Sequence, residues 1–142
     1  GCGHPGAAAP LADARFAELA EALGRLAATG EETVIDLKSL PVSPADLEAL
    51  GERLGTGEVR CDLEVAGRSE VRETAYSGIW WVRHYGAGDE LAVEEIVVTR
   101  VPEILVSHPD DVAFAARRMR EAVDQPKTED STAADEEDLS RG

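Results

Sequence analysis

One stretch decides the fold of this 142-residue chain: residues 58–85 read EVRCDLEVAGRSEVRETAYSGIWWVRHY. In it, apolar residues alternate with polar ones, a period of two that is typical of a β-strand with one buried face. Two breaks, Ala66–Ser69 and Ser77–Gly78, are rich in the residues that tight turns prefer. The stretch therefore predicts three antiparallel strands, at residues 59–65, 70–76 and 79–85.

A fourth strand follows directly. Residues 86–89 favour another turn, residues 91–101 are again rich in apolar and β-branched residues, and Pro102 ends the run because it cannot donate to a sheet ladder. The apolar positions of this strand change phase at Glu94–Glu95, which predicts a β-bulge there.

Helical periodicity surrounds this meander. It begins at Leu11 and ends at Gly30, returns after Ser43 and ends at Gly55, and returns again from Pro109 to Val123. Ser43 is a typical N-cap, because its hydroxyl can accept from a free backbone N–H, and Pro44 suits the first helical turn. A short strand is predicted at residues 33–37. The fold class is therefore α+β: a mostly antiparallel β-meander sheet with helices packed on one face.

The composition changes near the C-terminus. Residues 124–142 hold seven acidic and two basic residues and only one large apolar side chain, Leu139. Such a segment buries too little apolar surface to offset the entropy of ordering. We expect residues 1–10 to be a flexible segment, residues 11–123 a single α+β domain, and residues 124–142 a disordered acidic tail.

The charge of the chain restricts its partners. With a formal net charge of −15, it lacks the basic surface that nucleic-acid-binding proteins show. No stretch approaches the roughly 20 apolar residues that a membrane-spanning helix needs. We therefore expect no nucleic acid, no membrane insertion and a cytoplasmic location.

Residues able to carry chemistry are few and scattered. Cys2, Cys61, His84 and His108 show none of the spacings typical of a metal site, and no nucleophile motif accompanies them. Glu73 and His84 could pair across neighbouring strands, but they form no known catalytic pattern. We identify no catalytic residue, metal ligand or cofactor, and we expect the protein not to be an enzyme.

The adjacent tryptophans in the third strand are the strongest sign of binding. Neighbouring residues of a strand face opposite sides, so Trp80 and Trp81 cannot enter the same core. Because Arg83 is costly to bury unpaired, we expect Trp80 and Val82 to face the core and Trp81 to be exposed beside Arg83. Exposed aromatic and arginine side chains are enriched in protein interfaces. Helices on both faces, or one tryptophan shielding the sheet, remain alternatives.

The residues that we predict to bind a partner come from this strand and its surroundings. They are Glu58, Glu73, Trp81, Arg83, His84 and Tyr85.

Four runs of the chain together resemble a known family, the HupH/HyaF hydrogenase expression/formation proteins. They lie at Leu40–Leu47, Leu54–Val59, Glu73–Arg83 and Val101–Leu105. The resemblance covers about residues 33–122. It implies a non-enzymatic, chaperone-like assembly factor in the maturation of an uptake [NiFe]-hydrogenase. The implied partner is the precursor of the iron–sulfur small subunit, or another hydrogenase maturation protein.

A second hypothesis is kept beside this one: a small metal- or cofactor-handling protein, or an enzyme, acting in hydrogenase cofactor assembly. Under the first hypothesis, the acidic surface would favour a basic segment of the partner, such as a twin-arginine signal region, through electrostatic steering.

Overall fold

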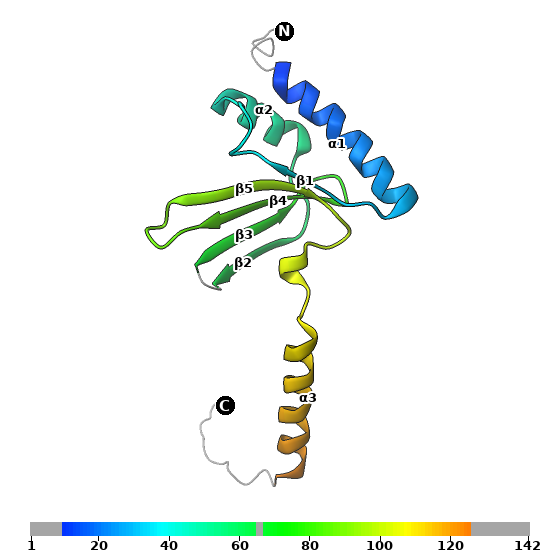
Figure 1. The fold of residues 1–142 in the computed structure, drawn as a ribbon, viewed down its shortest axis with the longest axis vertical. Coiled ribbons are helices and arrows are strands. Elements are labelled where there is room, and N and C mark those ends of the chain that lie inside the picture. Colours follow the sequence, from blue (N-terminus) through cyan, green and yellow to red (C-terminus); the bar gives the residue numbers. More distant parts are fainter. Residues whose placement is uncertain (1–9, 65–66, 126–142) are drawn as a thin grey trace. The chain divides into compact units, whose positions relative to one another are not determined.

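The computed structural model describes residues 10–64 and 67–125 (Figure 1). Within them, the elements follow in the order α1 (Pro10–Thr29), β1 (Thr33–Asp36), α2 (Pro44–Leu54), β2 (Arg60–Glu64), β3 (Arg68–Glu73), β4 (Ile79–Tyr85), β5 (Leu91–Val98), the short 3₁₀ helix η2 (Glu103–Leu105) and α3 (Pro109–Asp124). The five strands form one antiparallel sheet in the order β1-β5-β4-β3-β2. The predicted α+β class is confirmed.

The main core lies between the sheet and the two helices α1 and α2, which share one face of it in Figure 1. Its buried apolar side chains come from both layers: Leu19, Ala22 and Leu26 of α1, Leu50 and Leu54 of α2, and Ile35, Ile79, Trp81, Ile96 and Val98 of the sheet. This arrangement explains the helical periodicity of the sequence, because each helix turns one apolar stripe towards the strands.

Helix α2 begins as its sequence predicts. Ser43 is in an extended conformation, and its hydroxyl accepts a hydrogen bond from the backbone N–H of Asp46 at 3.1 Å. Pro44 occupies the first turn, and the N–H of Gly55 bonds back to the carbonyl of Gly51 where the helix ends. These interactions satisfy backbone groups that a helix terminus would otherwise leave free.

The connection between β3 and β4 is longer than predicted, because β3 ends at Glu73 and residues 74–78 form the turn. Thr74 is buried, and its hydroxyl donates to the carbonyl of Ile79 at 2.9 Å. Gly78 has a φ of +98°, and a Cβ there would lie 2.9 Å from Cδ1 of Leu23 in α1. The turn therefore requires glycine both for its backbone conformation and for the close approach of α1.

A register irregularity does occur between β4 and β5, but not at the predicted place. His84 pairs with Val93 and Tyr85 with Leu91, so the extra residue is Ala92. The prediction of a bulge at Glu94–Glu95 was wrong. Glu94 follows the alternation of the strand and is buried on the helix side of the sheet, where the sequence pattern favoured an apolar residue.

A second compact unit begins at Ile104 and contains α3. The imidazole of His108 caps this helix by accepting from the N–H of Asp110 at 3.0 Å. Pro109 follows in the first turn, as the sequence predicts. The predicted tail lies outside the described residues except for positions 124 and 125, and so does most of the segment 1–10. The assignment of residues 11–123 to a single domain stays a prediction.

Candidate functional site

Strand β4 buries both of its tryptophans. Trp81 is 4% exposed and belongs to the core beneath the helices, whereas Trp80 is 6% exposed on the opposite face. The prediction that Trp81 is exposed, with Trp80 and Val82 on the helix side, was therefore wrong. The reasoning failed because it treated Arg83 as unpaired, and Arg83 has a partner that lies eleven residues further along the chain.

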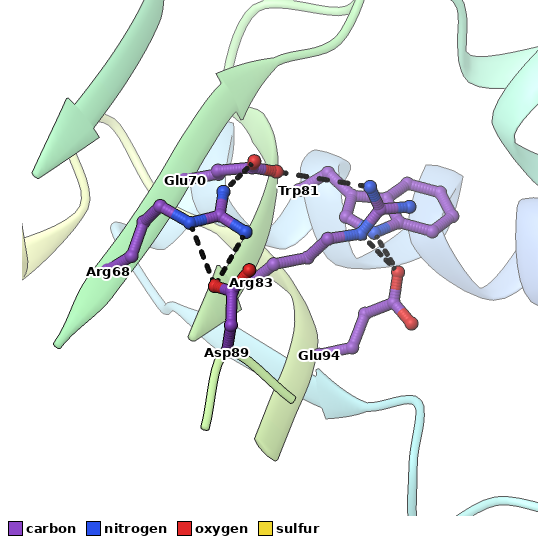
Figure 2. Close-up of polar contacts among 6 residues, drawn as sticks. All are labelled: Arg68, Glu70, Trp81, Arg83, Asp89 and Glu94. Atoms are coloured by element: carbon purple, nitrogen blue, oxygen red, sulfur yellow. Dashed lines mark hydrogen bonds and ion pairs between the residues drawn. The ribbon is translucent and has the colours of Figure 1, made fainter. Parts of the chain in front are cut away.

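That partner is Glu94 of β5. One of its carboxylate oxygens, Oε2, accepts from the indole N–H of Trp81 at 2.7 Å and from Nε of Arg83 at 2.8 Å (Figure 2). Burial acts to lower the pKa of Arg83, but the hydrogen bond to Glu94 raises it above the ordinary arginine value. A buried carboxylate is tolerated here because a cation and an N–H donor both compensate its desolvation.

A second ion pair extends this cluster towards the end of the sheet. Arg68 of β3 donates to Glu70 at 2.6 Å and to Asp89 at 3.2 Å, and its guanidinium lies 3.8 Å from the centre of the Tyr85 ring. The hydrogen bond to Asp89 is the main cause that raises the pKa of Arg68. Asp89 has a φ of +64°, a conformation that aspartate tolerates and that the β4–β5 turn uses.

We call the six residues of Figure 2 the polar cluster: Arg68, Glu70, Trp81, Arg83, Asp89 and Glu94. They come from β3, β4, β5 and the turn that joins β4 to β5. Glu70, Arg83 and Glu94 pair in register across β3, β4 and β5, and alternation places them on the same face of the sheet as Trp81, the face that α1 and α2 cover.

The predicted partner-binding residues are not brought together in one place. Trp81, Arg83 and Tyr85 lie at or beside the polar cluster. His84 faces the opposite side of the sheet, where a hydrogen bond of 2.7 Å joins its Nδ1 to the hydroxyl of Ser69. Glu73 is at the last position of β3, and Glu58 follows Gly57, whose N–H bonds to the carbonyl of Glu73.

Sequence reasoning missed an apolar groove along α1. It has a volume of about 420 Å³, and we call it the α1 groove. The residues that line it include Phe16, Ala20, Leu23, Gly24, Ala27 and Tyr76. Phe16 and Tyr76 meet edge to face, with ring centres 5.8 Å apart. The small residues of α1 are the sequence signal for this groove, but small residues in a helix equally predict close packing inside a core.

A second hollow adjoins this groove and shares Leu23 and Ala27 with it. It is lined in addition by Glu73, Ser77, Gly78 and Arg100, so its wall is more polar. Of the predicted binding residues, Glu73 thus lies next to the apolar groove. No sequence pattern connects Glu73 with α1, because the two are about 50 positions apart and meet only through the fold.

Within residues 10–64 and 67–125, no group of three or more His, Cys, Asp and Glu side chains is arranged to hold a metal ion. Over the same residues, no helix is both long enough and apolar enough to cross a lipid bilayer.

Comparison with known proteins shows which family the chain resembles. Residues 11–125 match the family described as HupH hydrogenase expression protein, C-terminal conserved region. The chain is 34% identical over 87 residues to the hydrogenase expression/formation protein HoxQ of Azotobacter vinelandii, which covers 61% of this chain and 31% of that protein. It is 33% identical over 95 residues to HupH of Rhodobacter capsulatus, covering 67% of this chain and 34% of that one.

A solved structure agrees with these matches. The hydrogenase expression protein HupH from Thiobacillus denitrificans ATCC 25259 is 40% identical, with a TM-score of 0.74 over 79% of this chain and 93% of that one. The chain spans about a third of the length of the curated relatives it matches. The resemblance found in the sequence is confirmed: this chain belongs to the family of the HupH C-terminal conserved region.

Proposed function

We propose that this chain is a non-enzymatic accessory factor in the maturation of an uptake [NiFe]-hydrogenase, and that it holds the precursor of the iron–sulfur small subunit. The names of its relatives support the first part, because they are hydrogenase expression/formation proteins. The second part needs a surface that can hold a protein segment. Because Trp81 is buried in the core, it cannot form that surface, which must lie elsewhere.

The single observation that carries the proposal is the α1 groove. Contiguous exposed apolar surface and apolar grooves are typical of sites that bind proteins or ligands. Between Phe16 and Ala27 the groove follows about 17 Å of helix. The small side chains of Ala20, Gly24 and Ala27 allow another helix or an extended apolar segment to approach α1 closely.

Charge indicates which segment of the precursor would bind there. A secretory signal combines basic residues with an apolar run of about 7–15 residues. The apolar run suits the α1 groove, and the basic residues suit a chain of net charge −15 that has Glu73 in the adjoining hollow. Because a signal is bound before export, the proposed location of the complex is the cytoplasm. Of the predicted partner-binding residues, Glu73 lines this adjoining hollow.

Two neighbouring alanines of α1 give a matched test. Ala27 lines the α1 groove, whereas Ala28 is exposed on the same helix and does not line it. Ala27→Glu should weaken capture of the purified small-subunit precursor about tenfold or more, because it places a charge in the apolar groove. Ala28→Glu should leave capture unchanged, while both variants keep the same melting temperature to within a few degrees.

Equal capture by the two variants would refute the α1 groove as the holding surface. The same preparations can be analysed for iron, nickel and zinc. A stoichiometric metal that survives dialysis against a chelator would favour the cofactor-handling hypothesis over the assembly factor.

A further inference from the structure

Three neighbouring strands each place an arginine on the face of the sheet that carries the polar cluster. Arg60 of β2 pairs in register with Arg72 of β3, which in turn pairs with Trp81 of β4. Arg83 lies two positions beyond Trp81 on the same face. These four side chains and Glu70 line a hollow of about 70 Å³, which we call the arginine pocket.

Two of the carboxylates next to this pocket are already engaged. Glu94 accepts from Trp81 and Arg83, and Glu70 accepts from Arg68 at 2.6 Å. Arg72 makes one weak hydrogen bond, at 3.4 Å, to the carbonyl of Gly55. Among the residues that the structure describes, no carboxylate lies within ion-pair distance of Arg60 or Arg72.

Arg60, Arg72 and Arg83 are crowded together with too few carboxylates to pair with all of them. Burial lowers the pKa of Arg72 below the ordinary arginine value, and the guanidiniums of Arg83 and Arg60 lower it further. An anion between these groups would relieve the repulsion. This feature is unusual in a chain whose net charge is −15, since positive charge is the minority on its surface.

The indole of Trp81 forms an apolar wall of the pocket. The guanidinium carbons of Arg72 and Arg83 lie 5.5 and 5.9 Å from the centre of a Trp81 ring, within the range of cation–π attraction. Trp81 is itself fixed by its hydrogen bond to Glu94. The Trp81 ring thus contacts the guanidiniums of Arg72 and Arg83 without using their N–H donors. Because Arg72 has several N–H donors and makes one hydrogen bond, the others can bind a ligand.

We propose that the arginine pocket binds a single carboxylate presented by a partner polypeptide. The residues that line the pocket include three arginines and one carboxylate, Glu70, so the lining has a net charge of +2 that a bound carboxylate would reduce. Arg68 and Asp89 form a pair beside them and do not change this charge. A volume of about 70 Å³ admits a group of this size but not a nucleotide. The inference rests on the proposed function only in that the ligand belongs to a protein.

The test is a titration of the ¹⁵N-labelled full chain with short capped peptides, followed by NMR at the Trp81 indole N–H and at Nε of Arg72. Acetyl-Gly-Glu-Gly-amide presents a side-chain carboxylate, and acetyl-Gly-Gly-Gly with a free C-terminus presents a terminal one. Acetyl-Gly-Gln-Gly-amide is the neutral control. Saturable shifts with a carboxylate peptide, and none with the neutral peptide, are expected, and the two acidic peptides identify which source of carboxylate is preferred.

Variants test the assignment to the pocket. Arg72→Gln should weaken carboxylate binding about tenfold or more, because a hydrogen bond to a charged group is lost. Arg60→Gln should weaken it less, since Arg60 is exposed. The matched control is Arg25→Gln, which removes an exposed arginine of α1 that pairs with Glu31, and it should bind as the unchanged chain does.

Several results would overturn the proposal: no saturable shift, equal shifts with the neutral peptide, unchanged binding in Arg72→Gln, or tighter binding of inorganic phosphate than of either acidic peptide. The six acidic residues of positions 126–142 could also compete. If their replacement by amides strengthens peptide binding, the pocket serves the chain's own tail and not a partner.

Failure here and failure of the proposed function are distinguishable. The peptide titration contains no hydrogenase component, and Ala27→Glu does not alter the arginine pocket. Precursor capture that depends on Ala27, with no binding of peptides, would refute the carboxylate site alone. Peptide binding without an effect of Ala27→Glu would refute the α1 groove alone.

Discussion

Replacing each tryptophan of β4 by phenylalanine should separate two hydrogen bonds of different strength. Trp81→Phe removes the donor that bonds to the buried Glu94 carboxylate at 2.7 Å. Trp80→Phe removes a donor that bonds to the neutral backbone carbonyl of Thr99 at 3.1 Å. The two substitutions remove the same atoms from side chains of similar burial, so the loss of apolar contact is matched.

The magnitudes follow from the charge of the acceptors. A hydrogen bond to a charged group contributes about 1.5–3 kcal/mol to stability, whereas one between neutral groups contributes about 0.5–1.5 kcal/mol. Trp81→Phe also leaves Glu94 with only Arg83 as a described partner for its buried oxygen. We therefore expect Trp81→Phe to lower the free energy of unfolding by about 1–2 kcal/mol more than Trp80→Phe.

Urea denaturation followed by circular dichroism measures this difference, provided that the slope m is the same for both variants. A double-mutant cycle with Glu94→Gln should then give a coupling energy of about 0.5–3 kcal/mol with Trp81→Phe and close to zero with Trp80→Phe. If Trp80→Phe is the more destabilising variant, or if Glu94→Gln couples equally to both, the assignment of Glu94 as the group that holds Trp81 is refuted.

Other substitutions test the local structure. Ser43→Ala removes the N-cap of α2 and should lower the free energy of unfolding by about 1 kcal/mol, measured by urea denaturation. The hydrogen bond from Ser39 is the main cause that lowers the pKa of Asp36, so Ser39→Ala should raise that pKa towards 3.8 in an NMR titration. The stabilisation from this pair is present above the pKa that Asp36 has in the unfolded state, and it is lost as the pH falls through the lowered pKa of the folded state. Gly78→Ala should lower the melting temperature by several degrees, because its φ is positive and its Cβ would meet Leu23.

Much of the fold is predictable from local signals, since these act within a few residues. The cap at Ser43, the alternation of residues 58–64 and the turns at Gly67 and Gly78 each specify their own element, and together they specify a meander. The edge strand β1 was also predicted from its own β-branched residues.

The face of each tryptophan was not predictable, because it depends on pairing between distant residues. Alternation shows only that Trp80 and Trp81 point in opposite directions. Which of them joins the main core depends on Glu94, and the sequence pattern placed a bulge at that position. The α1 groove was missed for a similar reason, since an exposed Ala or Gly in a helix and a buried one look the same in a sequence.

The position of β1 in the sheet has a consequence for the order of folding. Its partner is β5, and Ile35 and Ile96, which pair in register, are about 60 positions apart, whereas the neighbouring strands from β2 to β5 are joined by short turns. Contacts between near residues form at a lower entropic cost, so we expect the meander to fold first and β1, together with α1 before it, to dock last.

The groove on α1 would then be the last surface to form and, by the same logic, the first to be lost. Local opening of α1 would abolish the groove while the meander stays folded, so release of a bound segment would require neither global unfolding nor a separate hinge. Hydrogen exchange that is no faster in α1 than in β4 would rule out this sequence of events.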